Sequence, residues 1–90
     1  MKKKTATEEW LVEQGEIHEG LLKMDGYDDC IVGICERFGQ ESCIIYDYDM
    51  VIAKLMSDGC SEEEAIEWHE FNQLGAWVGD RTPAFLHSLP

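Results

Sequence analysis

Two short apolar runs near the middle of the chain limit the folds that the sequence can adopt. The first run covers residues 30–35, and the second covers residues 42–46. Both contain β-branched residues and are bounded by polar or glycine residues, which is typical of β-strands. The segment Phe38-Gly39-Gln40-Glu41 between them has the composition of a turn. We therefore expect a β-hairpin whose first strand is apolar on both faces.

The segments on either side of this hairpin carry signals for helices. Thr5 followed by Glu8 is a capping-box pattern, which predicts a helical stretch that ends at Asp25-Gly26. After the hairpin, Asp47 can cap a helix that Asp58-Gly59 closes. One helix is therefore predicted before the hairpin and one directly after it.

Ser61 followed by Glu64 is the strongest local signal in the chain. The Ser61 hydroxyl can accept a hydrogen bond from the Glu64 backbone N–H, while the Glu64 carboxylate reaches back. The helix that begins here should continue to about Ala76, and residues 84–87 form a candidate last strand. The order α-β-β-α-α-β predicts one α+β domain over residues 1–90. Its small, mainly antiparallel sheet would combine the hairpin with the C-terminal strand, beside two or three helices.

The charge of the chain is strongly negative and restricts its partners. Nineteen Asp and Glu stand against seven Lys and Arg, and the formal net charge is −12. Residues 1–4 hold three of the seven cations and are expected to be a mobile basic tail. An acidic body repels nucleic acid and anionic membranes, and it favours a partner protein with a basic surface. With no membrane-length apolar run and no secretory signal pattern, the sequence predicts a protein of the cytosol.

The cysteines and histidines give weak signals for metal or redox chemistry. The four cysteines are Cys30, Cys35, Cys43 and Cys60. Their spacing provides no C-x2-C knuckle, so we expect reduced, structural thiols, with metal binding and redox work less favoured. The segment from His69 to Gln73 looks like a zinc-protease helix, but Gln73 takes the place of the second histidine. We expect His69 to be satisfied by a hydrogen bond, and no metal or cofactor to be bound.

Asp47 and Asp49 offer two carboxylates at the end of the second predicted strand, a position where magnesium sites occur. Asp28 and Asp29, just before the first strand, are the acidic residues that could complete such a site. Capping of the following helix explains Asp47 and Asp49 more simply. A metal-dependent enzyme that uses Asp47 and Asp49 is therefore an alternative hypothesis.

Three glutamates of the last predicted helix share one face. Glu63, Glu67 and Glu70 follow i, i+4, i+7 spacing, so the second and third lie about 6 and 10 Å along the axis from the first. Such a row could imitate a line of phosphates and enter a basic groove, or it could be an ordinary solvated face. The same spacing recurs in the first predicted helix, at Glu9, Glu13 and Glu16.

Apolar side chains lie near this acidic face in the second half of the same helix. Phe71, Leu74 and Val78 lie near the acidic side of the helix. Apolar residues wrap most of the way round this segment, which indicates a helix that is either central to the fold or half covered by a partner. We therefore take Glu63, Glu67 and Glu70, with Phe71 and Leu74 as apolar anchors, as the candidate partner-binding residues.

About two thirds of the chain, from Gly26 to Leu86, resembles a family of small uncharacterised proteins encoded by tailed bacteriophages. The matching segments are Gly26-Tyr27-Asp28-Asp29, Ile31-Val32-Gly33, Tyr46-Asp47, Leu55-Met56-Ser57-Asp58-Gly59, Ser61-Glu62-Glu63-Glu64-Ala65-Ile66-Glu67-Trp68, Glu70-Phe71-Asn72, Gly75-Ala76-Trp77-Val78-Gly79 and Thr82-Pro83. His69 and Gln73 depart from the family pattern, where an aromatic and an aliphatic residue are expected. The resemblance implies an accessory protein of the kind that binds and disables host machinery, including nucleic-acid-binding defence effectors.

The leading hypothesis is a non-enzymatic acidic phage-type accessory protein that binds a host protein and inhibits or redirects it. An anti-defence protein that mimics DNA is the specific form of this hypothesis. The first alternative is a structural or regulatory homodimer without a host target. The second is the metal-dependent enzyme built on Asp47 and Asp49.

Overall fold

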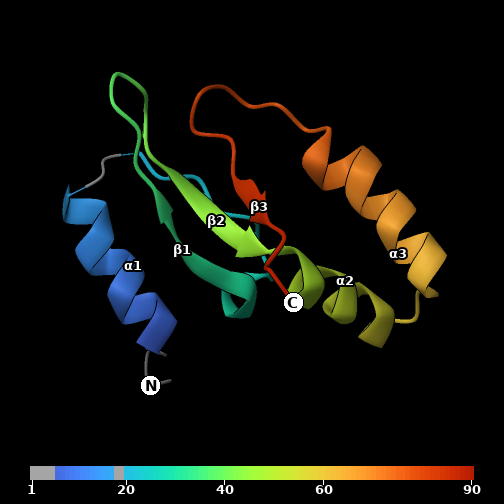
Figure 1. Ribbon diagram of the computed structural model, residues 1–90. Helices are drawn as coiled ribbons and strands as arrows, with labels where there is room; N and C mark the ends of the chain where they lie inside the picture. The colour runs from blue at the N-terminus through green and yellow to red at the C-terminus, as the bar shows by residue number, and fades with distance from the viewer. Residues whose placement is uncertain (1–5, 18–19) are drawn as a thin grey trace.

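The computed structural model describes residues 6–17 and 20–90 and confirms the predicted α+β fold and element order (Figure 1). Its elements are α1 (Ala6–Ile17), the 3-10 turn η1 (Asp28–Cys30), β1 (Ile31–Cys35), β2 (Cys43–Asp47), α2 (Tyr48–Ser57), α3 (Glu62–His69), the π-helical turn η2 (Glu70–Leu74) and β3 (Ala84–Leu86). The predicted basic tail over residues 1–4 and the capping residue Thr5 lie outside the described residues. In Figure 1, α1 lies on the β1 side of the sheet, while α2 and α3 lie toward the other side.

The sheet has three strands in the order β1-β2-β3, and the central strand, β2, is the most buried of the three. β1 and β2 form the predicted antiparallel hairpin, with an irregularity in the register between Ile31 and Gly33. β3 pairs in parallel with β2, and Tyr46 lies opposite Phe85. A parallel partner requires a long crossover connection, which α2 and α3 provide. The sheet is therefore mixed.

Tyr46 is the centre of the hydrophobic core. Its side chain is fully buried, and its ring centroid lies 6.0 Å from that of Phe85. The phenolic oxygen accepts a hydrogen bond of 2.6 Å from the Met24 backbone N–H, which holds the segment before η1 against the sheet. The core residues around it come from η1, β2, α2 and α3, namely Cys30, Ile44, Val51, Ile52, Leu55 and Ala65.

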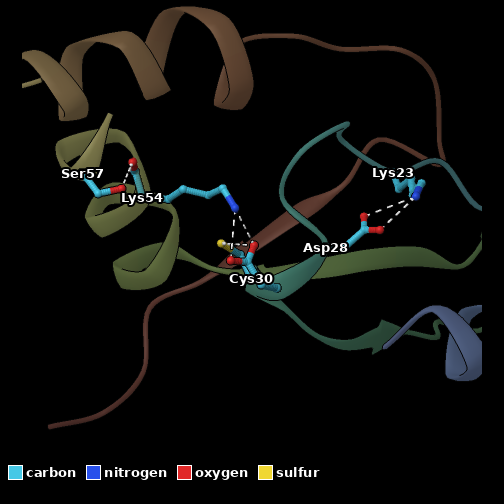
Figure 2. A network of polar contacts seen from close by, with 6 residues as sticks. Lys23, Asp28, Cys30, Lys54 and Ser57 are labelled. Atoms are coloured by element: carbon cyan, nitrogen blue, oxygen red, sulfur yellow. Dashed lines mark hydrogen bonds and ion pairs between the residues drawn. The ribbon is translucent and has the colours of Figure 1, made fainter. Parts of the chain in front are cut away.

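A set of polar contacts joins η1 to its surroundings (Figure 2). Lys54 extends from α2 and donates to both carboxylate oxygens of Asp29, at 2.9 and 3.1 Å. Lys23 forms an ion pair of 3.0 Å with Asp28. The hydrogen bond from Lys54 lowers the pKa of Asp29, although solvent-exposed pairs of this kind contribute little to stability. Their main effect is to neutralise two of the few cations of the chain.

Tyr46→Phe is expected to reduce the free energy of unfolding by about 1–2 kcal/mol, because the Met24 N–H loses a part-buried acceptor while the ring packing stays. Urea unfolding measures the change. Tyr48→Phe, which also removes one phenolic oxygen but not this hydrogen bond, is the matched control and should differ little from the natural chain. Equal effects of the two substitutions would contradict this assignment.

Candidate functional site

α3 begins at the predicted capping box, and both of its hydrogen bonds are present. The Glu64 N–H donates to the Ser61 hydroxyl at 3.2 Å, and the Ser61 N–H donates to the Glu64 carboxylate at 3.0 Å. The hydrogen bonds from Ser61 lower the pKa of Glu64, because they stabilise its charged form. The start of the acidic helix is therefore fixed by its own first turn.

One side of the α3–η2 segment faces the core through a row of residues spaced four apart. Ala65, His69 and Gln73 are all buried, and His69 is only 2% exposed. The His69 Nδ1 lies 2.7 Å from the Gln73 Oε1, and since an amide oxygen only accepts, His69 donates in this bond. The predicted hydrogen-bonded His69 is thus confirmed. The two residues that resemble half of a zinc motif form a core hydrogen bond instead.

Aromatic rings surround this pair and join it to the sheet. The His69 ring meets Tyr48 edge-on with centroids 5.3 Å apart, and meets Phe85 edge-on at 4.5 Å. Burial raises the pKa of Tyr27, and a hydrogen bond with Gln73 acts in the opposite direction. His69 and Gln73 therefore connect α3 to the start of α2, to β3 and to the segment before η1.

The α-helix is shorter than the sequence predicts. Regular α-helical structure ends at His69 and not near Ala76, and a single π turn over Glu70–Leu74 follows. The Gly75 N–H closes this turn on the Glu70 carbonyl at 3.0 Å. A side chain at Gly75 would bring its Cβ to 2.9 Å from that carbonyl oxygen, so glycine allows the close approach. The turn directs Gln73 inward toward His69.

The three predicted glutamates lie on the side of this segment that faces away from the core. Glu63 and Glu67 are exposed on α3, and Glu70 is exposed at the start of η2. In the described part of the chain, the ion pairs leave all three without a cationic partner. These pairs join Lys23 to Asp28, Lys54 to Asp29 and Arg81 to Glu41. The negative charge of this face is therefore not compensated locally.

Large apolar side chains are exposed next to the glutamates. Phe71 is 76% exposed and Leu74 is 60% exposed, so both predicted anchors lie outside the core. The apolar exposure continues beyond η2 with Trp77 and Val78. We use the name acidic–apolar face for the exposed side of α3 and η2 formed by Glu63, Glu67, Glu70, Phe71 and Leu74.

An open groove of about 360 Å³ lies beside this face. It is lined by Cys60, which precedes α3, and by residues along one stripe of α3 and η2, namely Glu64, Glu67, Trp68, Phe71 and Asn72. Of the predicted residues, the groove brings together Glu67 and Phe71, while Glu63, Glu70 and Leu74 do not line it. Trp68 was not among the predicted site residues. Its position four residues after Glu64 and three before Phe71 is the signal that could have identified it.

Asp47 is the N-cap of α2, and Asp49 lies in the first turn of the same helix. The Asp47 carboxylate accepts a hydrogen bond of 2.9 Å from the Met50 N–H at the start of α2, and Asp49 is exposed in its first turn. Asp28 and Asp29 are engaged by lysines. Within residues 6–17 and 20–90, no three His, Cys, Asp or Glu side chains lie together as a metal site would need, and no helix is long and apolar enough to cross a membrane.

Comparison of the chain with models of protein families, with curated proteins and with solved structures finds no match. The fold and the site define the chain as a small α+β protein whose main surface feature is the acidic–apolar face. Two features of that face, the capping box and the π turn, can be tested directly on the isolated chain.

Glu64 is expected to titrate below its ordinary pKa of 4.5, because the Ser61 N–H and hydroxyl interact with its charged form. Since the pKa is lower in the folded state than in the unfolded one, this contribution to stability is present above the unfolded pKa and is lost as the pH falls through the folded pKa. An NMR titration that follows the Glu64 carboxyl carbon measures the midpoint. Ser61→Ala should raise it, and a midpoint at or above 4.5 in the natural chain would contradict the capping box.

Gly75→Ala is expected to lower the free energy of unfolding by about 1–3 kcal/mol, because the added Cβ collides with the backbone that closes the π turn. Gly33→Ala is the matched control, since a Cβ at Gly33 meets no atom within 4 Å. Chemical unfolding of both variants gives the comparison. A Gly75→Ala protein as stable as the Gly33→Ala protein would show that the turn does not need this close approach.

Proposed function

We propose that this chain is a non-enzymatic accessory protein of phage type that binds a host protein through the acidic–apolar face and inhibits or redirects it. The observation that carries the proposal is the position of Phe71 and Leu74, which the fold leaves exposed beside Glu63, Glu67 and Glu70. The resemblance of the sequence to small phage proteins supports a host protein as the partner. The bound state would form in the cytosol of the host cell.

The apolar side chains would supply most of the binding free energy. Full burial of a Phe or Leu side chain contributes about 1.5–3 kcal/mol relative to exposure. Phe71 and Leu74 retain most of their exposed surface in the free chain, so this contribution is available to a partner. Aromatic anchors of this kind often dominate protein interfaces, while the surrounding contacts exclude water.

The glutamates would select a partner with a basic surface. Uncompensated carboxylates accelerate encounter with a cationic surface and penalise a like-charged one. The groove offers a place for one Arg or Lys of the partner, whose carbon stem can lie on Trp68 and Phe71 while its charge faces Glu67. Direct binding of nucleic acid or of an anionic membrane is disfavoured by the same charge.

A nucleic-acid-binding defence effector is the partner class that this charge pattern suits best. Its basic groove would accept the carboxylate row in place of phosphates, which is the action of a DNA mimic. A homodimer through the same face would place two uncompensated acidic rows against each other, and such like-charge contacts are unfavourable. The charge therefore favours a different protein over a second copy of the chain.

Photo-crosslinking tests the proposal on the intact chain. A photoreactive amino acid in place of Leu74 should crosslink to one basic host protein in a bacterial lysate, whereas the same group in place of the exposed Val32 on β1 should not. The double variant Glu63→Gln with Glu67→Gln should weaken capture by about tenfold, equivalent to about 1.4 kcal/mol. Added salt should weaken capture by the natural chain.

Glu9→Gln with Glu13→Gln is the matched control for this experiment. Both residues are exposed on α1 and have the same spacing, so this double variant removes the same charge from another helix. If both double variants lost capture equally, the effect would come from net charge alone, and binding through one specific face would be contradicted. Crosslinks from position 74 only to a second copy of the chain, together with a dimer in sedimentation at micromolar concentration, would favour the homodimer instead.

A further inference from the structure

Two thiols lie directly opposite each other across the β1–β2 hairpin. The strand register pairs Cys35, the last residue of β1, with Cys43, the first residue of β2. Directly opposed residues of an antiparallel pair have Cα atoms about 4.5 or 5.5 Å apart, depending on the type of pair. Both separations fall in the range of about 4.4–6.8 Å that a disulfide requires. The backbone therefore already holds these two cysteines at bridging distance.

The surroundings of the two thiols differ in a way that sets the order of their reactions. Cys35 is half-buried, whereas Cys43 is only 3% exposed. Burial raises the pKa of the Cys43 thiol, and the neighbouring Cys35 raises it further. A reagent in solution therefore reaches Cys35 first, and Cys43 is placed to react next.

The other two thiols stand apart from this pair. Cys30 is buried in the core, and burial is the main cause that raises its pKa to about 11. Cys60 follows α2 in the sequence and lines the groove beside α3. Neither is paired with Cys35 or Cys43 in the strand register. The hairpin pair is thus distinct from the remaining cysteines in position.

We propose that Cys35 and Cys43 form a reversible dithiol–disulfide pair that a small disulfide of the glutathione type oxidises. The Cys35 thiolate attacks one sulfur of the oxidised glutathione, forms a mixed disulfide and releases one glutathione thiolate. The Cys43 thiolate then attacks the Cys35 sulfur, forms the bond across the hairpin and releases the second glutathione thiolate. The two protons from the cysteines end on the two glutathione molecules, and the small disulfide is reduced as the protein is oxidised.

The bond would close the loop of residues 36–42, whose tip carries the fully exposed Phe38. A cross-link restricts the unfolded chain more than the folded one, which already holds the two residues together. The oxidised hairpin should therefore be the more stable form. In a reducing cytosol the pair stays as a dithiol, and a shift toward oxidising conditions closes it.

The reaction is tested on the reduced full chain incubated with oxidised glutathione. The expected product is a monomer that has lost two hydrogens and carries no glutathione, and dithiothreitol should reverse the change. Cleavage by trypsin after Arg37 should leave residues 24–37 linked to residues 38–54, the second of which contains only Cys43. Thermal unfolding of the closed form should occur at a higher temperature than that of the dithiol form.

Three single variants assign the bond and its order of formation. Cys43→Ser should stop at a stable glutathione adduct on Cys35, Cys35→Ser should give no closed form, and Cys60→Ser should close as the natural chain does. A natural chain that accumulates a glutathione adduct without closing would overturn the proposal. So would a closed form that persists in Cys43→Ser or disappears in Cys60→Ser.

Discussion

The buried hydrogen bond between His69 and Gln73 allows one side of the last helix to face the core, and so leaves the opposite side in solvent. Both residues lie in the row that begins at Ala65, and their polar atoms satisfy each other inside the core at 2.7 Å. An unpaired polar group at either position would be costly to bury, so the bond allows this row to face the core. The edge-on contacts of the His69 ring with Tyr48 and Phe85 then hold the row in place. Because this row faces inward, Glu63, Glu67 and Glu70 on the other side of the helix face the solvent. The π turn extends the same arrangement to Phe71 and Leu74.

Most of the cations outside residues 1–4 pair with carboxylates that are not on α3. Lys23 and Lys54 pair with the aspartates of η1, and Arg81 pairs with Glu41 in the hairpin loop. None of these pairs includes a residue of α3, so the helix with the most consecutive glutamates makes no ion pair among the described residues. A face that combines this charge with exposed aromatic and aliphatic side chains is poorly suited to contact with nucleic acid or with its own copy. It supports the proposal of a basic protein partner.

Local signals explain why much of the fold could be predicted. The capping residues Asp47 and Ser61 act on the backbone a few positions away, so their sequence patterns suffice to place the starts of α2 and α3. The apolar runs likewise predicted the hairpin. The parallel direction of β3 and the π turn were not predicted, because they depend on the crossover and on the contact between His69 and Gln73. The opposition of Cys35 and Cys43 depends on the hairpin register, which seven intervening residues do not specify.

The candidate site could also be predicted in part, because helical spacing is a local signal. Helical spacing placed the three glutamates on one side, but it could not decide whether Phe71 and Leu74 lie in the core. The answer depends on which side of the helix packs against the sheet. The buried His69, whose ring contacts Phe85 of β3, belongs to that side. The proposed function therefore depends most on the outward position of Phe71.

Fluorine NMR on the chain labelled with 4-fluorophenylalanine measures this position directly. The three phenylalanines give one resonance each, and a neutral soluble gadolinium chelate broadens each in proportion to its exposure. The structure places Phe38 fully in solvent, Phe71 at 76% exposure and Phe85 packed against the core. Phe71 should therefore broaden nearly as much as Phe38 and several times more than Phe85. A Phe71 resonance as well protected as that of Phe85 would contradict the outward-facing site.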